Sequence, residues 1–130
     1  MTNKNRQRFF LSKNKILRGE RTIKRVFDEG TFVKGRWFDV VYLCRTEFDE
    51  FKIAFAAARR ARNAVERNCI KRKLREAFRL EQMALQPQCY AVVIGNTKII
   101  KADLAAVRVE MKRVFGATGL MILHPRIDTN

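Results

Sequence analysis

One segment, residues 59–79, constrains the fold most, because it combines an apolar helical stripe with a dense set of cations. Asn63 is followed three residues later by Glu66, a capping-box pattern that predicts a helix beginning near Ala64 and ending before Pro87. Apolar residues then recur at the three- and four-residue spacing of one helical face: Ile70, Leu74, Ala77 and Phe78. The segment therefore predicts a helix that buries one face in a core.

The opposite face of this predicted helix is strongly basic. Nine of the 21 residues in the segment are Lys or Arg, and only two are acidic. Lys71, Arg75 and Arg79 form a ridge at i, i+4 and i+8, with Asn68 and Arg72 beside it. Like charges at this spacing destabilise an isolated helix, and a merely solvated helix would intersperse glutamates. Planar guanidinium groups and an amide favour contact with folded RNA.

The charge of the whole chain agrees with a polyanionic partner. Its 130 residues carry a formal net charge of +15. No segment approaches the ~20 apolar residues of a membrane span, and the apolar run at residues 9–11 is too short for a secretory signal. We therefore expect a cytoplasmic protein that does not use a membrane. The candidate RNA-binding residues are Arg59, Arg60, Arg62, Arg67, Asn68, Lys71, Arg72, Arg75 and Arg79.

The remaining patterns predict one domain over residues 1–130, with a basic arm at 1–18 and an irregular tail at 116–130. The order is α-β-β-α-β-α, with room for one more short strand. A strand–helix–strand step implies parallel pairing, so we expect an α+β or α/β sandwich with a small mixed sheet packed by helices. Outside the central helix, the expected elements are a helix from Thr22 to Gly30, strands at 38–44, 51–58 and 89–94, and a helix at 102–115 stopped by Gly116.

The strand at 51–58 alternates between large and small side chains. One face carries Phe51, Ile53, Phe55 and Ala57, whereas the other carries only Lys52 and small residues: Ala54, Ala56 and Ala58. A face of small residues indicates close approach of another group. We favour a packed helix there over a bound ligand.

The cysteines are three in number and far apart. Cys44, Cys69 and Cys89 form no C-x-x-C pair, and a single histidine, His124, cannot complete a zinc site. We therefore predict three reduced thiols and no metal bound by the protein.

The central segment resembles the signature helix of the ribonuclease P protein family. That signature is an AVxRNRxKRxxRExxR-type string. The chain departs from it at Cys69, where the family has arginine, and at Arg62, where glycine is usual. The matching positions are Ala64, Val65, Arg67, Asn68, Lys71, Arg72, Arg75, Glu76 and Arg79.

The resemblance implies both a fold and a function. The family fold has an unusual left-handed crossover between parallel strands. Its protein binds the large catalytic RNA through the arginine-rich helix and contacts the 5′ leader of precursor tRNA in a cleft floored by the sheet. The holoenzyme removes the leader with Mg²⁺ held mainly by RNA, so we expect no catalytic residue in the protein and no obligate protein partner. Aromatic rings can stack leader bases; Phe27 and Tyr42 are the candidates, although each could instead belong to the core.

Three other functions fit parts of the sequence. A free-standing metal nuclease needs several convergent carboxylates, whereas Glu47, Asp49 and Glu50 lie in a predicted loop. A general structured-RNA-binding protein of ribosomal type explains the charge but not the string from Arg67 to Arg79. A membrane-surface peptide explains the charge alone.

Overall fold

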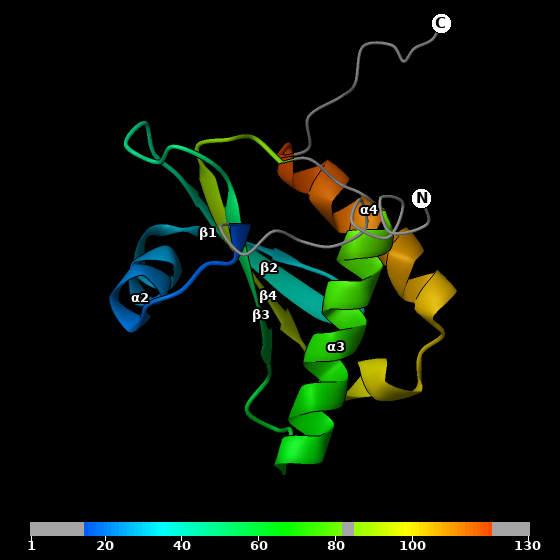
Figure 1. Ribbon diagram of the computed structural model, residues 1–130. Helices are drawn as coiled ribbons and strands as arrows, with labels where there is room; N and C mark the ends of the chain where they lie inside the picture. Colours follow the sequence, from blue (N-terminus) through cyan, green and yellow to red (C-terminus); the bar gives the residue numbers. More distant parts are fainter. Residues whose placement is uncertain (1–14, 82–84, 121–130) are drawn as a thin grey trace, which may run out of the picture.

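The computed structural model describes residues 15–81 and 85–120. A four-stranded sheet separates α2 on one face from α3 and α4 on the other (Figure 1). The elements, in chain order, are α2 (Glu20–Glu29), β1 (Thr31–Lys34), β2 (Phe38–Cys44), β3 (Lys52–Ala57), α3 (Ala64–Leu80), β4 (Cys89–Gly95), the 3₁₀ helix η2 (Thr97–Lys101) and α4 (Leu104–Thr118).

The sheet is mixed and its strand order is β1-β2-β4-β3. β2 pairs antiparallel with both β1 and β4, whereas β3 and β4 pair in parallel. Because α3 connects β3 to β4, the parallel pair is the one that the strand–helix–strand order predicted. β1 is the additional short strand. The left hand of the crossover stays a prediction from the family resemblance.

The predicted stripe of α3 forms the centre of the larger core. Ile70, Leu74 and Ala77 are completely buried and Phe78 nearly so, against β3, β4 and α4. The helix also starts where expected, since the Glu66 N–H donates to Asn63 Oδ1 at 2.9 Å. Glu66 Oε1 in turn accepts from the Arg62 N–H at 3.0 Å. Both the cap and the buried face of α3 are therefore confirmed.

The ends of two other helices differ from the predictions. α2 begins at Glu20, directly after Gly19, rather than at a Thr22 cap. α4 continues through Gly116 to Thr118 and ends at Gly119, whose positive φ of 75° suits a residue without Cβ. Residues 116–118 are thus helical rather than irregular. η2 was not predicted, because its few residues carry too short a pattern to read.

The two predicted end segments are described only in part. Leu17, near the end of the proposed basic arm, is buried, and its N–H donates to the Ile53 carbonyl at 2.9 Å. The arm therefore joins the outer edge of β3 at that point. Residues 1–14 and 121–130, including His124, lie outside the described residues.

The small face of β3 is not covered as expected. α3 packs against the other face, where Ile53 and Phe55 lie. Ala54 and Ala56 point to the α2 side, but α2 lies over β2 and β4, so both alanines stay half-buried. The prediction of a helix on this face is therefore wrong at β3, and the sheet is left partly open there.

Two of the three cysteines form a disulfide, which corrects the prediction of three reduced thiols. Cys44 and Cys89 are bonded, 45 residues apart in sequence. They lie directly opposite each other in the β2–β4 register. Cys69 remains a free thiol. The register between strands, which the sequence does not display, brings the pair together.

Two glycines give opposite expectations for a substitution to alanine. A Cβ on Gly95 would lie 2.5 Å from Ile70 Cγ2, so Gly95→Ala is expected to cost about 1–3 kcal/mol through overpacking. A Cβ on Gly116, inside α4, would meet nothing within 4 Å, so Gly116→Ala is expected to stabilise by about 0.5–1 kcal/mol. Urea unfolding of both variants measures the two effects. A Gly95→Ala protein as stable as the wild type would contradict the close packing of α3 on β4.

Candidate RNA-binding surface

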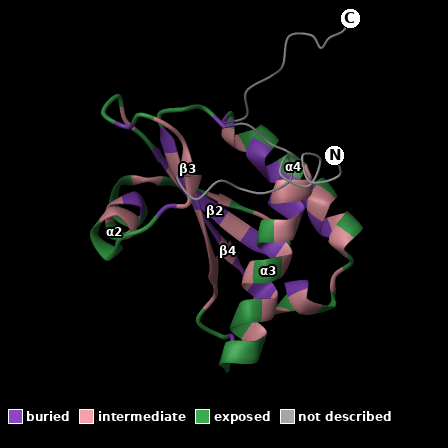
Figure 2. Ribbon diagram, in the orientation of Figure 1, coloured by how far each residue is buried: buried purple, intermediate pink, exposed green. Residues whose placement is uncertain are grey.

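The outer face of α3 presents cations that have no acidic partner among the described residues. Asn68, Arg72 and Arg75 are exposed and Lys71 is half-buried, all away from the stripe that faces the core. Figure 2 shows exposed and buried stretches alternating along this helix. Within residues 15–81 and 85–120, no ion pair involves Lys71, Arg72 or Arg75. These groups are therefore free to bind an external anion.

Two other cations of α3 have partners inside the protein. Lys73 Nζ donates to the carbonyl oxygens of Ile99, Ile100 and Ala102, at 3.1, 2.9 and 2.7 Å, and so fastens η2 to α3. Arg79, a predicted RNA contact, is half-buried, and its Nε donates to Glu76 Oε1 at 3.0 Å. The free part of the basic ridge is therefore centred on Arg72 and Arg75.

A second basic surface lies beside the start of α3. Arg59 and Arg60 are exposed in the loop after β3 and line a hollow of about 470 Å³. A neighbouring hollow is lined by Arg60, Arg62, Glu66 and Thr97. Since both share Arg60 and Thr97, the positive surface continues to the first turn of α3. We call the first one the cationic hollow; its basic residues are Lys34, Arg36, Arg59, Arg60 and Lys98.

Sequence reasoning found only Arg59 and Arg60 in the cationic hollow. Lys34 is the last residue of β1, Arg36 lies in the β1–β2 turn and Lys98 lies in η2, so they are isolated cations in the sequence. Their only common feature is spatial, and it depends on the pairing of β1, β2 and β4.

A buried carboxylate, that of Glu110, is hydrogen-bonded to the β1–β2 turn, which lines this hollow. Glu110 of α4 is only 7% exposed, and its Oε2 accepts from the backbone N–H of Arg36 at 2.5 Å and from Arg113 Nη2 at 2.8 Å. Gly35 is required in this turn, because a Cβ there would lie 2.4 Å from the Phe38 carbonyl oxygen, and it would also lie 3.0 Å from Glu110 Oε2. Hydrogen bonds from Arg113 and from the Arg36 N–H lower the pKa of Glu110, against the opposing effect of burial.

The two aromatic candidates for the leader lie on opposite faces of the sheet. Phe27 is 38% exposed on the α2 side, whereas Tyr42 packs against the core under α3 and α4. The neighbour of Phe27 is instead Phe32 of β1, 54% exposed, with ring centroids 6.1 Å apart. Sequence reasoning missed Phe32 because it did not recognise β1 as a strand. Beside this pair lies the open part of the sheet, the sheet floor, formed by half-buried Asp39, Ala54, Ala56 and Ile94.

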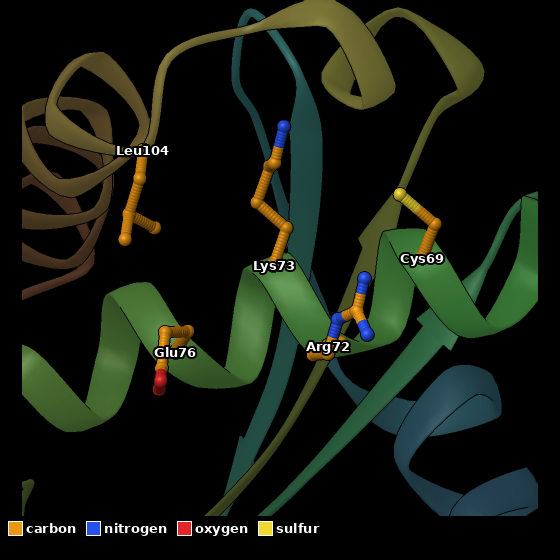
Figure 3. A pocket seen from close by; sticks show the side chains of 5 residues that line it. All are labelled: Cys69, Arg72, Lys73, Glu76 and Leu104. Carbon is orange, nitrogen blue, oxygen red and sulfur yellow. The ribbon is translucent and has the colours of Figure 1, made fainter.

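The two departures from the family string lie beside the outer ridge of α3 and in the loop before the helix. Cys69 is half-buried and lines a pocket of about 220 Å³ together with Arg72, Lys73, Glu76 and Leu104. Figure 3 shows Cys69 and Lys73 pointing to the same side of the helix. Arg62 is exposed in the loop before α3. Although Cys69 replaces an arginine of the family string, the neighbouring Arg72 and Arg75 are both exposed on α3.

Acidic residues do not converge anywhere in the described chain. Within residues 15–81 and 85–120, no three His, Cys, Asp or Glu side chains form a group able to hold a metal ion. In the loop of the nuclease alternative, Glu47 pairs with Arg25 at 2.8 Å and Glu50 with Lys15 at 2.9 Å. No helix built by the described residues combines the length and apolar character that a membrane crossing requires.

The fold and its surfaces define a class: a small basic α/β sandwich whose central helix carries a strongly basic outer face. Comparison with known proteins identifies the family. The family model described as Ribonuclease P matches residues 11–119. The chain belongs to the ribonuclease P protein family, which supplies the protein subunit of an RNA-based endonuclease that processes tRNA.

Individual relatives agree with this assignment. The ribonuclease P protein component of Exiguobacterium sibiricum is 28% identical over 110 residues, covering 85% of this chain and 95% of the relative. That of another Exiguobacterium species is 34% identical over 90 residues, covering 69% and 77%. The RNase P protein structure from Staphylococcus aureus matches with a TM-score of 0.70 at 21% identity, covering 83% of this chain and 98% of that one. The Thermotoga maritima protein matches with a TM-score of 0.64 at 25% identity, covering 75% and 92%.

The lowered pKa of Glu110 predicts that part of the free energy of unfolding depends on pH in the acid range. Its pKa in the folded protein is lowered below the usual value of 4.5, so the stabilisation is present above that pH and is lost as the pH falls through the folded pKa. We expect the free energy of unfolding to decline between pH 5 and acid pH less steeply in Glu110→Gln than in the wild type. Urea unfolding at a series of pH values measures the slopes. Equal slopes would contradict a Glu110 carboxylate stabilised by Arg113 and Arg36.

Proposed function

We propose that this chain binds the catalytic RNA of ribonuclease P through the outer face of α3, and the 5′ leader of precursor tRNA on the α2 side of its sheet. It thereby promotes removal of the leader to give the mature tRNA 5′ end. The observation that carries the proposal is the division of α3, which is buried along one stripe and charged along the other. A helix held so firmly presents its cations at fixed spacing to a folded RNA.

The contact with the catalytic RNA rests on unpaired positive charge. Arg72 and Arg75 are exposed and have no acidic partner among the described residues, so phosphates can bind them without breaking an internal ion pair. Arg67 is exposed as well, and its Nη1 donates to the Ala61 carbonyl at 3.4 Å, which directs the side chain along the loop before α3. Asn68 adds a group that can both donate to and accept from a base.

The contact with the leader rests on the sheet floor and its surroundings. Ala54 and Ala56 leave room for the backbone or bases of a single strand, and the exposed rings of Phe27 and Phe32 offer stacking surfaces. The cationic hollow at the end of the floor supplies partners for phosphates. These positions favour Phe27 and Phe32 over Tyr42 for this role.

The proposal assigns the cleavage chemistry to RNA. Mg²⁺ is held mainly by the RNA and the substrate, and the protein supplies no catalytic residue and needs no obligate protein partner. Support comes from the acidic residues, several of which are engaged in ion pairs with Lys and Arg rather than directed at one point. We further propose that the subunit acts in the cytoplasm, together with its RNA.

Reconstitution tests this function. The protein, a bacterial ribonuclease P RNA and a precursor tRNA are combined at low Mg²⁺, and cleavage at the mature 5′ end is followed with protein alone, RNA alone and both. The proposal predicts cleavage that requires the RNA and is strongly increased by the protein. No increase with folded protein and a cognate RNA would reject the proposal in favour of a general structured-RNA-binding protein. Cleavage by the protein alone would indicate a nuclease.

Substitutions on α3 test the RNA-binding face. Arg72→Ala and Arg75→Ala are each expected to weaken binding of the catalytic RNA and to reduce the slope of log affinity against log salt by about one unit, because each guanidinium displaces about one counterion. Filter binding at several salt concentrations measures both quantities. Lys24→Ala is the matched control, since Lys24 is an exposed cation of α2, on the other face of the sheet, paired with Asp28. Unchanged slopes for both α3 variants would remove this face from the interface.

A further inference from the structure

One carboxylate, that of Asp39, lies inside the cationic hollow. Asp39 is half-buried on β2 and lines the cationic hollow together with its five Lys and Arg residues. We propose that Asp39 reads a base of the leader and selects guanine. This inference rests on the proposed binding of the leader along the sheet floor.

The strand register places Asp39 on that floor. Neighbouring residues of β2 alternate between the two cores, and Val41 and Leu43 belong to the core under α2, so Asp39 points to the same side. Asp39 lies opposite Lys34 of β1 and Ile94 of β4, and Ile94 in turn lies opposite Ala56 of β3. No residue of this row is fully buried: Lys34 is exposed, and Asp39, Ile94 and Ala56 are half-buried.

The hydrogen bonding of Asp39 leaves acceptor capacity unused. Its Oδ1 accepts a long bond, 3.3 Å, from the backbone N–H of Gly35. Within the described residues, no ion pair involves Asp39, and Oδ2 accepts no hydrogen bond. A carboxylate there repels a passing phosphate, so its favourable partner on an RNA strand is a base that donates hydrogen bonds.

The donor pattern of the bases selects guanine. On the Watson–Crick edge, guanine presents two adjacent donors, N1–H and the N2 amino group, which match the two oxygens of one carboxylate. Cytosine and adenine each place a ring acceptor beside their amino group, and uracil has one donor between two carbonyls. These edges are free for recognition in a single strand.

The neighbouring aromatic residue can hold the adjacent base. Val41, the residue opposite Phe32, lies two residues beyond Asp39 on β2. Two residues of a strand span roughly 7 Å. One RNA strand can therefore stack a base on Phe32 and direct its neighbour at Asp39, while Arg59 and Arg60 bind the phosphates.

The test uses the reconstituted holoenzyme and precursor tRNAs whose leaders carry each of the four bases at each position in turn. We expect one leader position at which guanine raises kcat/KM about tenfold over the other bases, as expected for a paired contact to a base edge. Asp39→Asn, which replaces one acceptor with a donor, and Asp39→Ala are both expected to abolish that preference. Asp49→Asn, the same change in the exposed β2–β3 loop, controls for the loss of one negative charge and is expected to retain it.

The outcomes separate this inference from the function on which it rests. A guanine preference of less than twofold at every position, or one that survives in Asp39→Asn, would overturn the inference, even if the protein still accelerates leader removal. A protein that gives no acceleration at all would reject the proposed function instead. If Asp39 only supports the β1–β2 turn, its substitution changes the rates of all leaders by one common factor and leaves their ratios unchanged, which also overturns the inference.

Discussion

The packing of α3 on the parallel strand pair determines what the rest of this molecule can present. Ile70 and Leu74 pack so closely over Gly95 that a Cβ at that position has no space. This contact fixes the rotation of the helix about its axis, and with it the direction of every side chain on the outer face. Because like charges on one helix face are unfavourable by themselves, burial of the stripe is also what stabilises the ridge of cations.

The distribution of acidic residues is as informative as the net charge. Glu29 and Glu47 engage Arg25, Glu81 engages Arg108 and Lys112, and Glu110 engages Arg113. These pairs lie on α2, between α2 and the β2–β3 loop, on α4, and between the end of α3 and α4, away from the middle of the α3 ridge and from the loop before it. The excess of positive charge is therefore concentrated on two connected surfaces. Those are the surfaces assigned here to the catalytic RNA and to the phosphates of the leader.

Features that depend on residues close together in the sequence could be predicted, whereas features that depend on residues distant in the sequence could not. The cap, buried stripe and charged ridge of α3 depend on residues within one helix, and the sequence predicted them. The Cys44–Cys89 disulfide, the cationic hollow and the Phe27–Phe32 pair depend on register between strands that are distant in sequence. Tyr42 was a leader candidate by residue type alone, and alternation along β2 turned it toward the core under α3 and α4. The family string identified the family, whereas the additional short strand, β1, whose position the sequence did not give, supplied the surface beside α2.

The central claim is that two faces of one small domain bind two different RNAs, and photo-crosslinking in the assembled complex tests it most directly. A benzophenone side chain is introduced in place of Arg75 on α3 and, separately, in place of Lys34 at the rim of the sheet floor. The account predicts that position 75 crosslinks to the catalytic RNA and position 34 to the leader of the precursor. Crosslinks from position 75 to the leader, or from both positions to the same RNA, would contradict it.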